Sequence, residues 1–121
     1  MSKIMVIDDT EDTVELAKTI LEISGFEVSA YTSPETALAE LKKGNLPDLV
    51  ILDVRMPGIS GPEVCEQIRK DEKLKDLKII FFTASGETNI ELLKKHGVLG
   101  YIFKPFDNDE FVKNIKNYLA R

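Results

Sequence analysis

Four apolar segments of this sequence each end in polar residues that could take part in chemistry. The segments span residues 4–7, 49–52, 79–82 and 101–103. The residues that follow them are the acidic pair Asp8 and Asp9, the carboxylate Asp53, the hydroxyl residue Thr83 and the ammonium of Lys104. If the chain folds so that these ends meet, three carboxylates, one hydroxyl and one cation share a site.

The carboxylates would dominate the charge of such a site. Three carboxylates a few ångströms apart in a partly desolvated cleft cannot all remain ionised beside a single ammonium unless a further cation joins them. The donors are hard oxygens with neither His nor Cys among them, which favours Mg²⁺ over softer metals. A charge of −3 from the carboxylates, +2 from the metal and +1 from Lys104 leaves the site near neutral and able to accept an anion such as a phosphoryl group.

Parallel β-strands would bring these residues together. Continuous runs of β-branched and aromatic residues, with helical sequence between them, are typical of strands buried on both faces of a parallel sheet. Because parallel strands place their carboxyl ends at one edge of the sheet, we expect the polar residues to converge there. A further strand, residues 27–31, alternates Val28 and Ala30 with Ser29, which indicates an edge position.

Five helical patterns separate or follow the strands. The first follows Asp9, the second opens with the Ser33-Pro34 cap, the third starts at Gly61-Pro62, the fourth runs from about Thr88 to Gly97, and the fifth, marked by Phe111, reaches the C-terminus. Strand and helix therefore alternate five times. This pattern predicts an α/β fold, a doubly wound five-stranded parallel sheet with five helices, two on one face and three on the other.

Length and composition indicate one compact domain, residues 1–121. The chain has 121 residues with 43% apolar content, enough for a single core. Its formal net charge is −5 and its Lys and Arg residues are scattered, so we do not expect it to bind nucleic acid directly. Only four apolar residues follow Lys3, too few for a signal peptide or a membrane span, so we expect a cytoplasmic protein without a membrane partner. Cys65 is the single cysteine, which excludes an internal disulfide.

Together these motifs resemble one known family over the whole of residues 1–121, the response-regulator receiver domain of two-component signalling in the single-domain form of chemotaxis regulators. The resemblance rests on the acidic pair Asp8-Asp9, on Asp53 with Met56-Pro57-Gly58 and Gly61 after it, on Thr83-Ala84 and on Lys104-Pro105-Phe106. The motifs stand in the family's order and near its spacing. The resemblance implies a flavodoxin-like sheet with the strand order 2-1-3-4-5.

The resemblance also implies a role for each residue of the site. Asp53 would be the phosphoacceptor and would take a phosphoryl group from a phosphohistidine. Mg²⁺ would be held by Asp9, Asp53 and the backbone carbonyl of Arg55, with Asp8 acting through water. Lys104 would pair with a phosphoryl oxygen, and the peptide bond between Lys104 and the proline after it is expected to be cis.

Partners and output follow from the same resemblance. The phosphoryl donor would be a sensor histidine kinase or a phosphotransfer protein, and the signal would pass to a downstream target or a fused output domain. Thr83 would follow the phosphoryl group and let Tyr101 move from an exposed to a buried position, switching the face formed by the fourth helix, fifth strand and fifth helix. The domain would catalyse only its own phosphorylation and dephosphorylation, and it would not be an enzyme with an external product.

Other interpretations stay open at the level of the sequence. Asp8 and Asp9 could merely cap the first helix, and Tyr101 could be an ordinary core aromatic. A phosphohydrolase of the haloacid dehalogenase type also places a nucleophilic Asp after a strand, but it needs a second Asp where this chain has Thr10. A flavodoxin-like flavin-binding protein would need a phosphate loop rich in Ser, Thr and Gly at residues 8–12, which are mostly acidic here.

Overall fold

The computed structural model describes residues 2–84 and 95–121, and all five expected strands form one parallel sheet within them. The strands are β1 (Lys3–Ile7), β2 (Glu27–Tyr31), β3 (Leu49–Asp53), β4 (Ile79–Ala84) and β5 (Gly100–Lys104). Their order is β2-β1-β3-β4-β5, and each neighbouring pair is parallel. The structure therefore confirms the strand order and the flavodoxin-like topology expected from the sequence.

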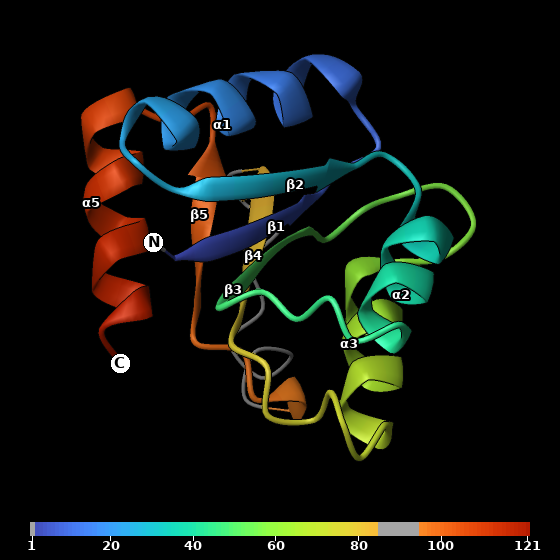
Figure 1. Cartoon of the computed structure of the whole chain (residues 1–121). Coiled ribbons are helices and arrows are strands. Elements are labelled where there is room, and N and C mark those ends of the chain that lie inside the picture. The colour runs from blue at the N-terminus through green and yellow to red at the C-terminus, as the bar shows by residue number, and fades with distance from the viewer. Residues whose placement is uncertain (1, 85–94) are drawn as a thin grey trace.

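Helices cover both faces of the sheet (Figure 1). They are α1 (Glu11–Ile23), α2 (Pro34–Lys42), α3 (Gly61–Lys70) and α5 (Asn108–Leu119). The helices α1 and α5 lie on one face, and α2 and α3 lie on the other. The fourth helix expected from about Thr88 falls mainly on residues 85–94, which lie outside the described residues, so the described part of the chain contains four helices where five were expected.

Burial explains why the inner strands carry unbroken apolar sequence. All five residues of β3 are buried, because this strand is central and has a layer of helices on each side. The strand β2 is half-buried apart from the exposed Glu27, which confirms the edge position predicted from its alternating sequence. Two apolar cores result, one between the sheet and helices α1 and α5, and one between the sheet and helices α2 and α3.

Side-chain caps fix where α2 and α3 begin. Ser33 Oγ accepts a hydrogen bond from the Thr36 amide at 3.3 Å, and Pro34 occupies the first turn of α2, as the sequence predicted. At α3, the Glu63 amide donates to Ser60 Oγ at 3.3 Å, and the Ser60 amide donates to Glu63 Oε1 at 3.2 Å. This reciprocal cap holds α3 directly after the loop that leaves β3, and that loop borders the candidate site.

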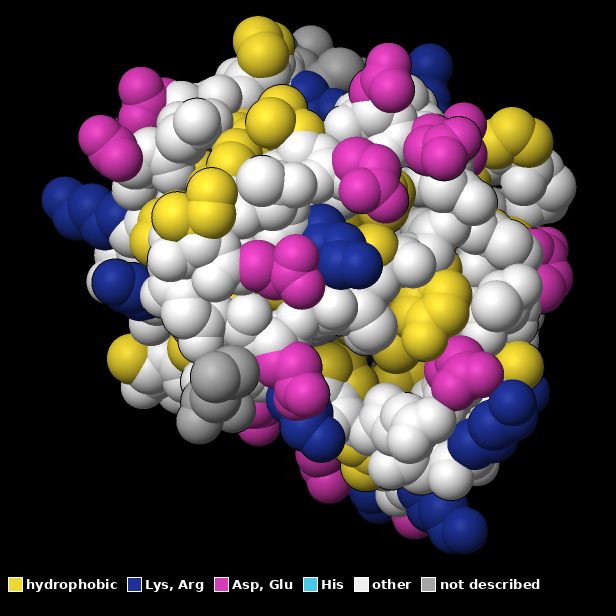
Figure 2. All heavy atoms as spheres, turned by 45° about the horizontal axis from the view of Figure 1, so that its top comes forward, with side chains coloured by type: hydrophobic (Ala, Val, Ile, Leu, Met, Phe, Trp, Pro, Cys, Tyr) yellow, Lys and Arg dark blue, Asp and Glu magenta, His cyan; other side chains and the backbone are white. Residues whose placement is uncertain are grey.

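Acidic and basic side chains are mixed on the surface. Figure 2 shows them interspersed on one face of the molecule, with hydrophobic side chains emerging between them. In residues 2–84 and 95–121, no helix is both long enough and apolar enough to cross a membrane.

Candidate functional site

Three carboxylates converge at the carboxyl end of the sheet, as the sequence predicted. Asp8 follows β1 and Asp53 ends β3, and these two strands are direct neighbours. The side chains of Asp8, Asp9 and Asp53 each offer an oxygen, and these oxygens all lie within 4.8 Å of one another. Asp8 has no exposed surface and Asp53 is 6% exposed, whereas Asp9 is exposed. The site is therefore a buried pair of carboxylates with a third at its mouth.

Lys104 brings the expected cation to this cluster. Its Nζ lies 2.6 Å from Asp8 Oδ2 and 3.3 Å from Asp53 Oδ1. Because β4 separates β5 from β3, the side chain must pass over β4, and Nζ lies 5.1 Å from the centroid of the Phe82 ring. The Phe82 ring stacks in turn on α5 through Phe111, with ring centroids 5.9 Å apart. The aromatic support under the ammonium was not predicted, because Phe82 is indistinguishable from other core residues in the sequence.

Asp8 serves both the start of α1 and the site. Its Oδ1 accepts a hydrogen bond from the Thr10 amide at 2.9 Å, and Thr10 is the residue before the first turn of α1. Its Oδ2 is buried and accepts no hydrogen bond of good geometry, although the Lys104 ammonium is close. One oxygen of Asp8 thus fixes the residue before α1 without capping the helix, and the other faces Lys104, while a role for Asp8 in metal binding stays a prediction.

Burial and charge shift the ionisation of the two central groups. The pKa of Asp53 is raised to about 7: burial is the largest cause, the negative charge of Asp8 and a hydrogen bond with Asp9 act in the same direction, and Lys104 opposes them. Burial also lowers the pKa of Lys104, but the carboxylates of Asp8 and Asp53 outweigh burial, so the pKa lies above its ordinary value. The ammonium therefore stays charged, while the ionisation of Asp53 is finely balanced.

The remaining predicted residues lie at the same edge or beside it. Thr83 is buried in β4, opposite Phe103 of β5 and one residue before the pair formed by Ala84 and Lys104. The peptide bond from Lys104 to the following proline is cis, as expected. Tyr101 is half-buried on β5, with its ring 4.9 Å from that of Phe103, so its part as a switch stays a prediction.

Gly61 has a physical reason that the sequence did not reveal. A Cβ at this position would collide with the backbone oxygen of Asp53, because the first turn of α3 lies directly against the end of β3. The Gly61 amide also donates to the Val54 carbonyl at 2.9 Å. The sequence marks Gly61 only as part of a loop motif, whereas the structure shows that its missing side chain lets α3 approach the backbone of Asp53. Arg55, in the same loop, is exposed, and a role for its carbonyl stays a prediction.

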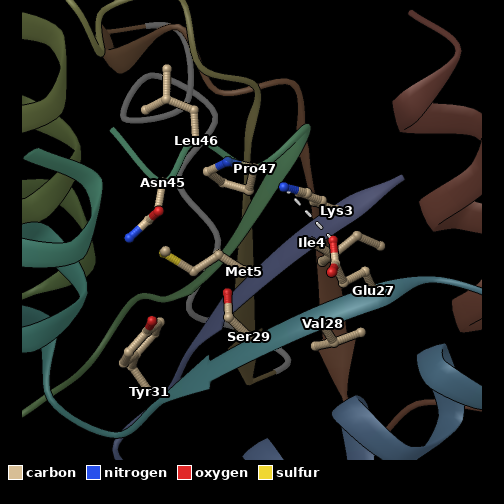
Figure 3. Close-up of a pocket in the computed structure, with 10 residues that line it drawn as sticks. All are labelled: Lys3, Ile4, Met5, Glu27, Val28, Ser29, Tyr31, Asn45, Leu46 and Pro47. Atoms are coloured by element: carbon tan, nitrogen blue, oxygen red, sulfur yellow. Dashed lines mark ion pairs between the residues drawn. The ribbon is translucent and has the colours of Figure 1, made fainter. Parts of the chain in front are cut away.

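A hollow of about 290 Å³ lies away from these carboxylates (Figure 3). Its walls come from the amino-terminal part of β1, from β2 and from the loop between α2 and β3. An ion pair of 3.8 Å between Lys3 and Glu27 closes one side of it. None of the predicted site residues lines this hollow.

The donor set fits a small hard cation. The three side chains offer only carboxylate oxygens, which are the ligands that Mg²⁺ and Ca²⁺ prefer. The three carboxylates outnumber the single Lys104 ammonium, whose Nζ lies 2.6 Å from the buried Asp8 Oδ2. The cluster of Asp8, Asp9 and Asp53 could therefore hold a metal ion.

Comparison with known sequences gives a family for this chain. The model of the response regulator receiver domain matches residues 4–116. The polar-differentiation response regulator DivK of Brucella ovis is 32% identical over 118 residues, which cover 97% of this chain and 95% of DivK.

Solved structures agree with the sequence matches. A Chloroflexus aurantiacus protein described as a response regulator matches with a TM-score of 0.90 and 36% identity, over 99% of this chain and 98% of the other. The chemotaxis protein CheY4 of Vibrio cholerae matches with a TM-score of 0.89 and 27% identity, over 98% of each chain. These matches do not favour a dehalogenase-type hydrolase or a flavin-binding protein. The chain belongs to the response-regulator receiver family, the phosphoacceptor domains of two-component signalling.

Proposed function

We propose that Asp53 accepts a phosphoryl group from a phosphohistidine on a sensor kinase or a phosphotransfer protein. The observation that carries this proposal is the place of the Asp53 carboxylate at the carboxyl end of the sheet. It lies 3.3 Å from the Lys104 ammonium and within 4.8 Å of the Asp8 and Asp9 carboxylates. A phosphoryl group on Asp53 would have that ammonium beside its oxygens.

Asp53 is the best placed of the three carboxylates. Asp8 has no exposed surface, and its two oxygens face the Thr10 amide and the Lys104 ammonium. Asp9 is exposed, and both ion pairs of Lys104 are made with the other two carboxylates. Asp53 alone combines some exposure, 6%, with a place between the ammonium and the acidic pair.

Asp8, Asp9 and Asp53 would hold Mg²⁺, together with the backbone carbonyl of Arg55. Bound there, the metal would neutralise charge on the phosphoryl oxygens in the loose transition state of the transfer. The hard oxygen donors and the excess of three carboxylates over one ammonium support this assignment.

The transfer is a nucleophilic displacement at phosphorus. An Asp53 oxygen forms the new bond to phosphorus while the bond to the histidine nitrogen breaks, and the imidazole leaves with the electron pair of that bond. Only the ionised carboxylate is a nucleophile, and without a metal the pKa of about 7 leaves Asp53 partly protonated at neutral pH. Lys104 favours the ionised form and then faces the oxygens of the incoming group.

Thr83 and Tyr101 would report the phosphorylation state to a downstream target or an output domain. Thr83 is buried at the end of β4, where a hydroxyl can turn toward a phosphoryl group on the neighbouring strand β3. Tyr101 lies on β5 beside Phe81 of β4, so a displacement of β4 and β5 reaches its ring. These roles rest on placement and on the family.

The donor protein would dock over α1 and the chain that leaves β5. A hollow of about 290 Å³ lined by Thr13, Leu16, Lys104, Pro105 and Phe106 lies beside the site. Leu16 is 50% exposed at its rim, and this large apolar side chain is available to a partner. A donor seated here would bring its phosphohistidine to the side of the site that Lys104 occupies.

Intact-mass measurement after incubation with Mg²⁺ and acetyl phosphate tests the acceptor. The wild type should gain one phosphoryl group that is labile to base and to hydroxylamine, and Asp53→Ala should gain none. Asp107→Ala is the matched control, because Asp107 caps α5 at the surface and touches no site carboxylate in the described structure. Unchanged phosphorylation of Asp53→Ala would contradict the assignment.

A pair of α1 variants tests the donor surface. Leu16→Glu should slow transfer from a phosphorylated kinase by about tenfold or more, equivalent to about 1.4 kcal/mol, because it places a charge in the docking hollow. Ile23→Glu is the control, since Ile23 is 81% exposed at the far end of the same helix. Phosphorylation by acetyl phosphate should stay unchanged in both. Equal slowing of kinase transfer by the two variants would place the docking surface elsewhere.

A further inference from the structure

The guanidinium of Arg69 binds four backbone carbonyls at the end of the sheet opposite the carboxylates. Its Nε donates to His96 O at 2.8 Å and its Nη2 to Gly97 O at 3.1 Å. Its Nη1 donates to Lys75 O at 2.7 Å and to Leu77 O at 2.8 Å. Arg69 lies in the last turn of α3 and is half-buried. One side chain thus joins α3 to two other segments of the chain.

The two segments are the chain before β4 and the chain before β5. Residues 75–77 lead into β4, and residues 96–97 lead into β5. The His96 carbonyl is held further by α3, because the Cys65 thiol, one turn before Arg69, lies 3.9 Å from the same oxygen. Only an arginine can reach such a set of acceptors, since its planar group directs five N–H donors along a fixed fork.

The bound segment ends where β5 begins to pair with β4. The Leu99 amide donates to the Ile79 carbonyl at 2.9 Å, two residues after Gly97. From there the two strands pair as far as Ala84 and Lys104. The ladder is therefore held at its amino end by Arg69, and its carboxyl end carries Thr83 and Lys104.

We propose that Arg69 is a positioning residue that limits how far the structural change caused by phosphorylation spreads toward the amino ends of β4 and β5. This inference rests on the proposed function of Asp53. With residues 96–99 fixed to α3, a change at Thr83 and Lys104 moves only the carboxyl ends of β4 and β5. Without the guanidinium, β5 can shift along its length, and the displacement spreads past Tyr101 to the amino end. Arg69 thereby confines the response in β5 to residues 101–104.

Two substitutions and one control separate this role from general stabilisation. Arg69→Met keeps an unbranched apolar stem but removes every donor. Arg69→Lys keeps the charge and presents its donors from a single nitrogen, so it cannot bridge the four carbonyls and should not rescue. Lys70→Met is the control, because Lys70 is the next residue of α3, is exposed, and pairs only with Glu66 on its own helix, at 3.3 Å, in the described structure.

The measurement is a map of amide resonances with and without beryllofluoride, which mimics the phosphoryl group on Asp53. In the wild type and in Lys70→Met, shifts should occur at residues 101–104 and be absent at 96–99. In Arg69→Met and Arg69→Lys, shifts should appear at 96–99, and hydrogen exchange of the Leu99 amide should become at least about tenfold faster. All variants should still gain one phosphoryl group from acetyl phosphate.

Shifts at 96–99 in the wild type, or an unchanged map in both Arg69 variants, would overturn this role of Arg69 while leaving Asp53 as the acceptor. A wild type that gains no phosphoryl group would overturn the proposed function first, and the role of Arg69 with it. If Arg69→Met does not fold, Arg69→Lys decides the matter alone.

Discussion

The two ends of the parallel sheet use charged side chains in opposite ways. At the carboxyl end, the buried Asp8 and Asp53 share one ammonium, that of Lys104, at 2.6 and 3.3 Å. At the amino end, Arg69 donates to four backbone carbonyls, and Lys78 Nζ donates at 2.9 Å to a carbonyl in the last turn of α5. The first arrangement leaves negative charge in excess, whereas the second pairs each cation with neutral acceptors.

This difference separates what the fold needs from what the site does. Backbone carbonyls at loops and helix ends need donors in any folded protein, so the cations of the amino end serve the architecture. Carboxylates that are buried within 4.8 Å of a third carboxylate repel one another and cost stability. Added cations should therefore change the stability of the carboxyl end and leave that of the amino end unchanged.

Removal of the shared ammonium should have the largest effect. Lys104→Met leaves two buried carboxylates without their cation, and we expect the free energy of unfolding to fall by about 3 kcal/mol at pH 8 without metal. Mg²⁺ should restore more than half of this loss, because it supplies the missing positive charge. Urea unfolding with EDTA and with Mg²⁺ measures both quantities.

The exposed Lys70→Met is the control for this experiment, with an expected change within about 0.5 kcal/mol. If Lys104→Met lost no more than this control, or if Mg²⁺ left the loss unchanged, the carboxyl end would not carry the excess charge inferred here.

The pH dependence of stability should show the same excess charge. The pKa of Asp53 is raised from 3.8 to about 7 by burial and by Asp8, so the folded state keeps a proton that the unfolded state has released. The free energy of unfolding without metal should therefore fall as the pH rises from about 4 to about 7, by about 3 kcal/mol from this group. Asp53→Asn should lose this part of the pH dependence, as urea unfolding at several pH values would show. If the free energy of unfolding changed with pH in the same way in wild type and variant, the raised pKa of Asp53 would be contradicted.

The site at the carboxyl end of the sheet could be predicted from the sequence because it is formed by side chains whose types and positions can be recognised there. Asp8, Asp53 and Lys104 each follow an apolar run, and the rule that parallel strands end at one edge suffices to bring them together. The strand order came from the family resemblance and not from the pattern. The approach of Lys104 over Phe82 could not be predicted, because it depends on rotamers and on the twist of the sheet.

The amino end could not be predicted, because its acceptors are backbone carbonyls. Arg69 is one of 16 basic residues in the sequence, and nothing in its neighbours marks it as different from Lys70. The carbonyls that it binds become available only when the chain before β4 and the chain before β5 turn toward α3. The same holds for Gly61, whose contact with the Asp53 backbone depends on the angle at which α3 leaves the loop.

Gly61→Ala should displace helix α3 without changing any charge. The added methyl group meets the backbone oxygen of Asp53, so α3 must shift, and we expect a loss of about 1 to 2 kcal/mol although alanine favours helix. Phosphorylation by acetyl phosphate should slow, because the acceptor strand and α3 move apart. Urea unfolding and intact mass test this variant. Glu66→Ala, at an exposed position of the same helix, is the control, and equal behaviour of the two variants would show that the close approach has no consequence.

Loss of the amino-end donors should have the smallest effect on stability. Arg69→Met removes hydrogen bonds to four carbonyls, but water can replace part of them at the exposed Lys75 and Gly97, so we expect a loss of about 1 kcal/mol. This loss should be the same with and without Mg²⁺, because the guanidinium takes no part in the balance of charge at the carboxylates. Urea unfolding of Arg69→Met beside Lys104→Met tests the contrast directly. If Mg²⁺ restored the stability of both variants alike, the two ends of the sheet would be coupled through β4 and β5. The carboxyl end would then not differ from the amino end in its response to added cations.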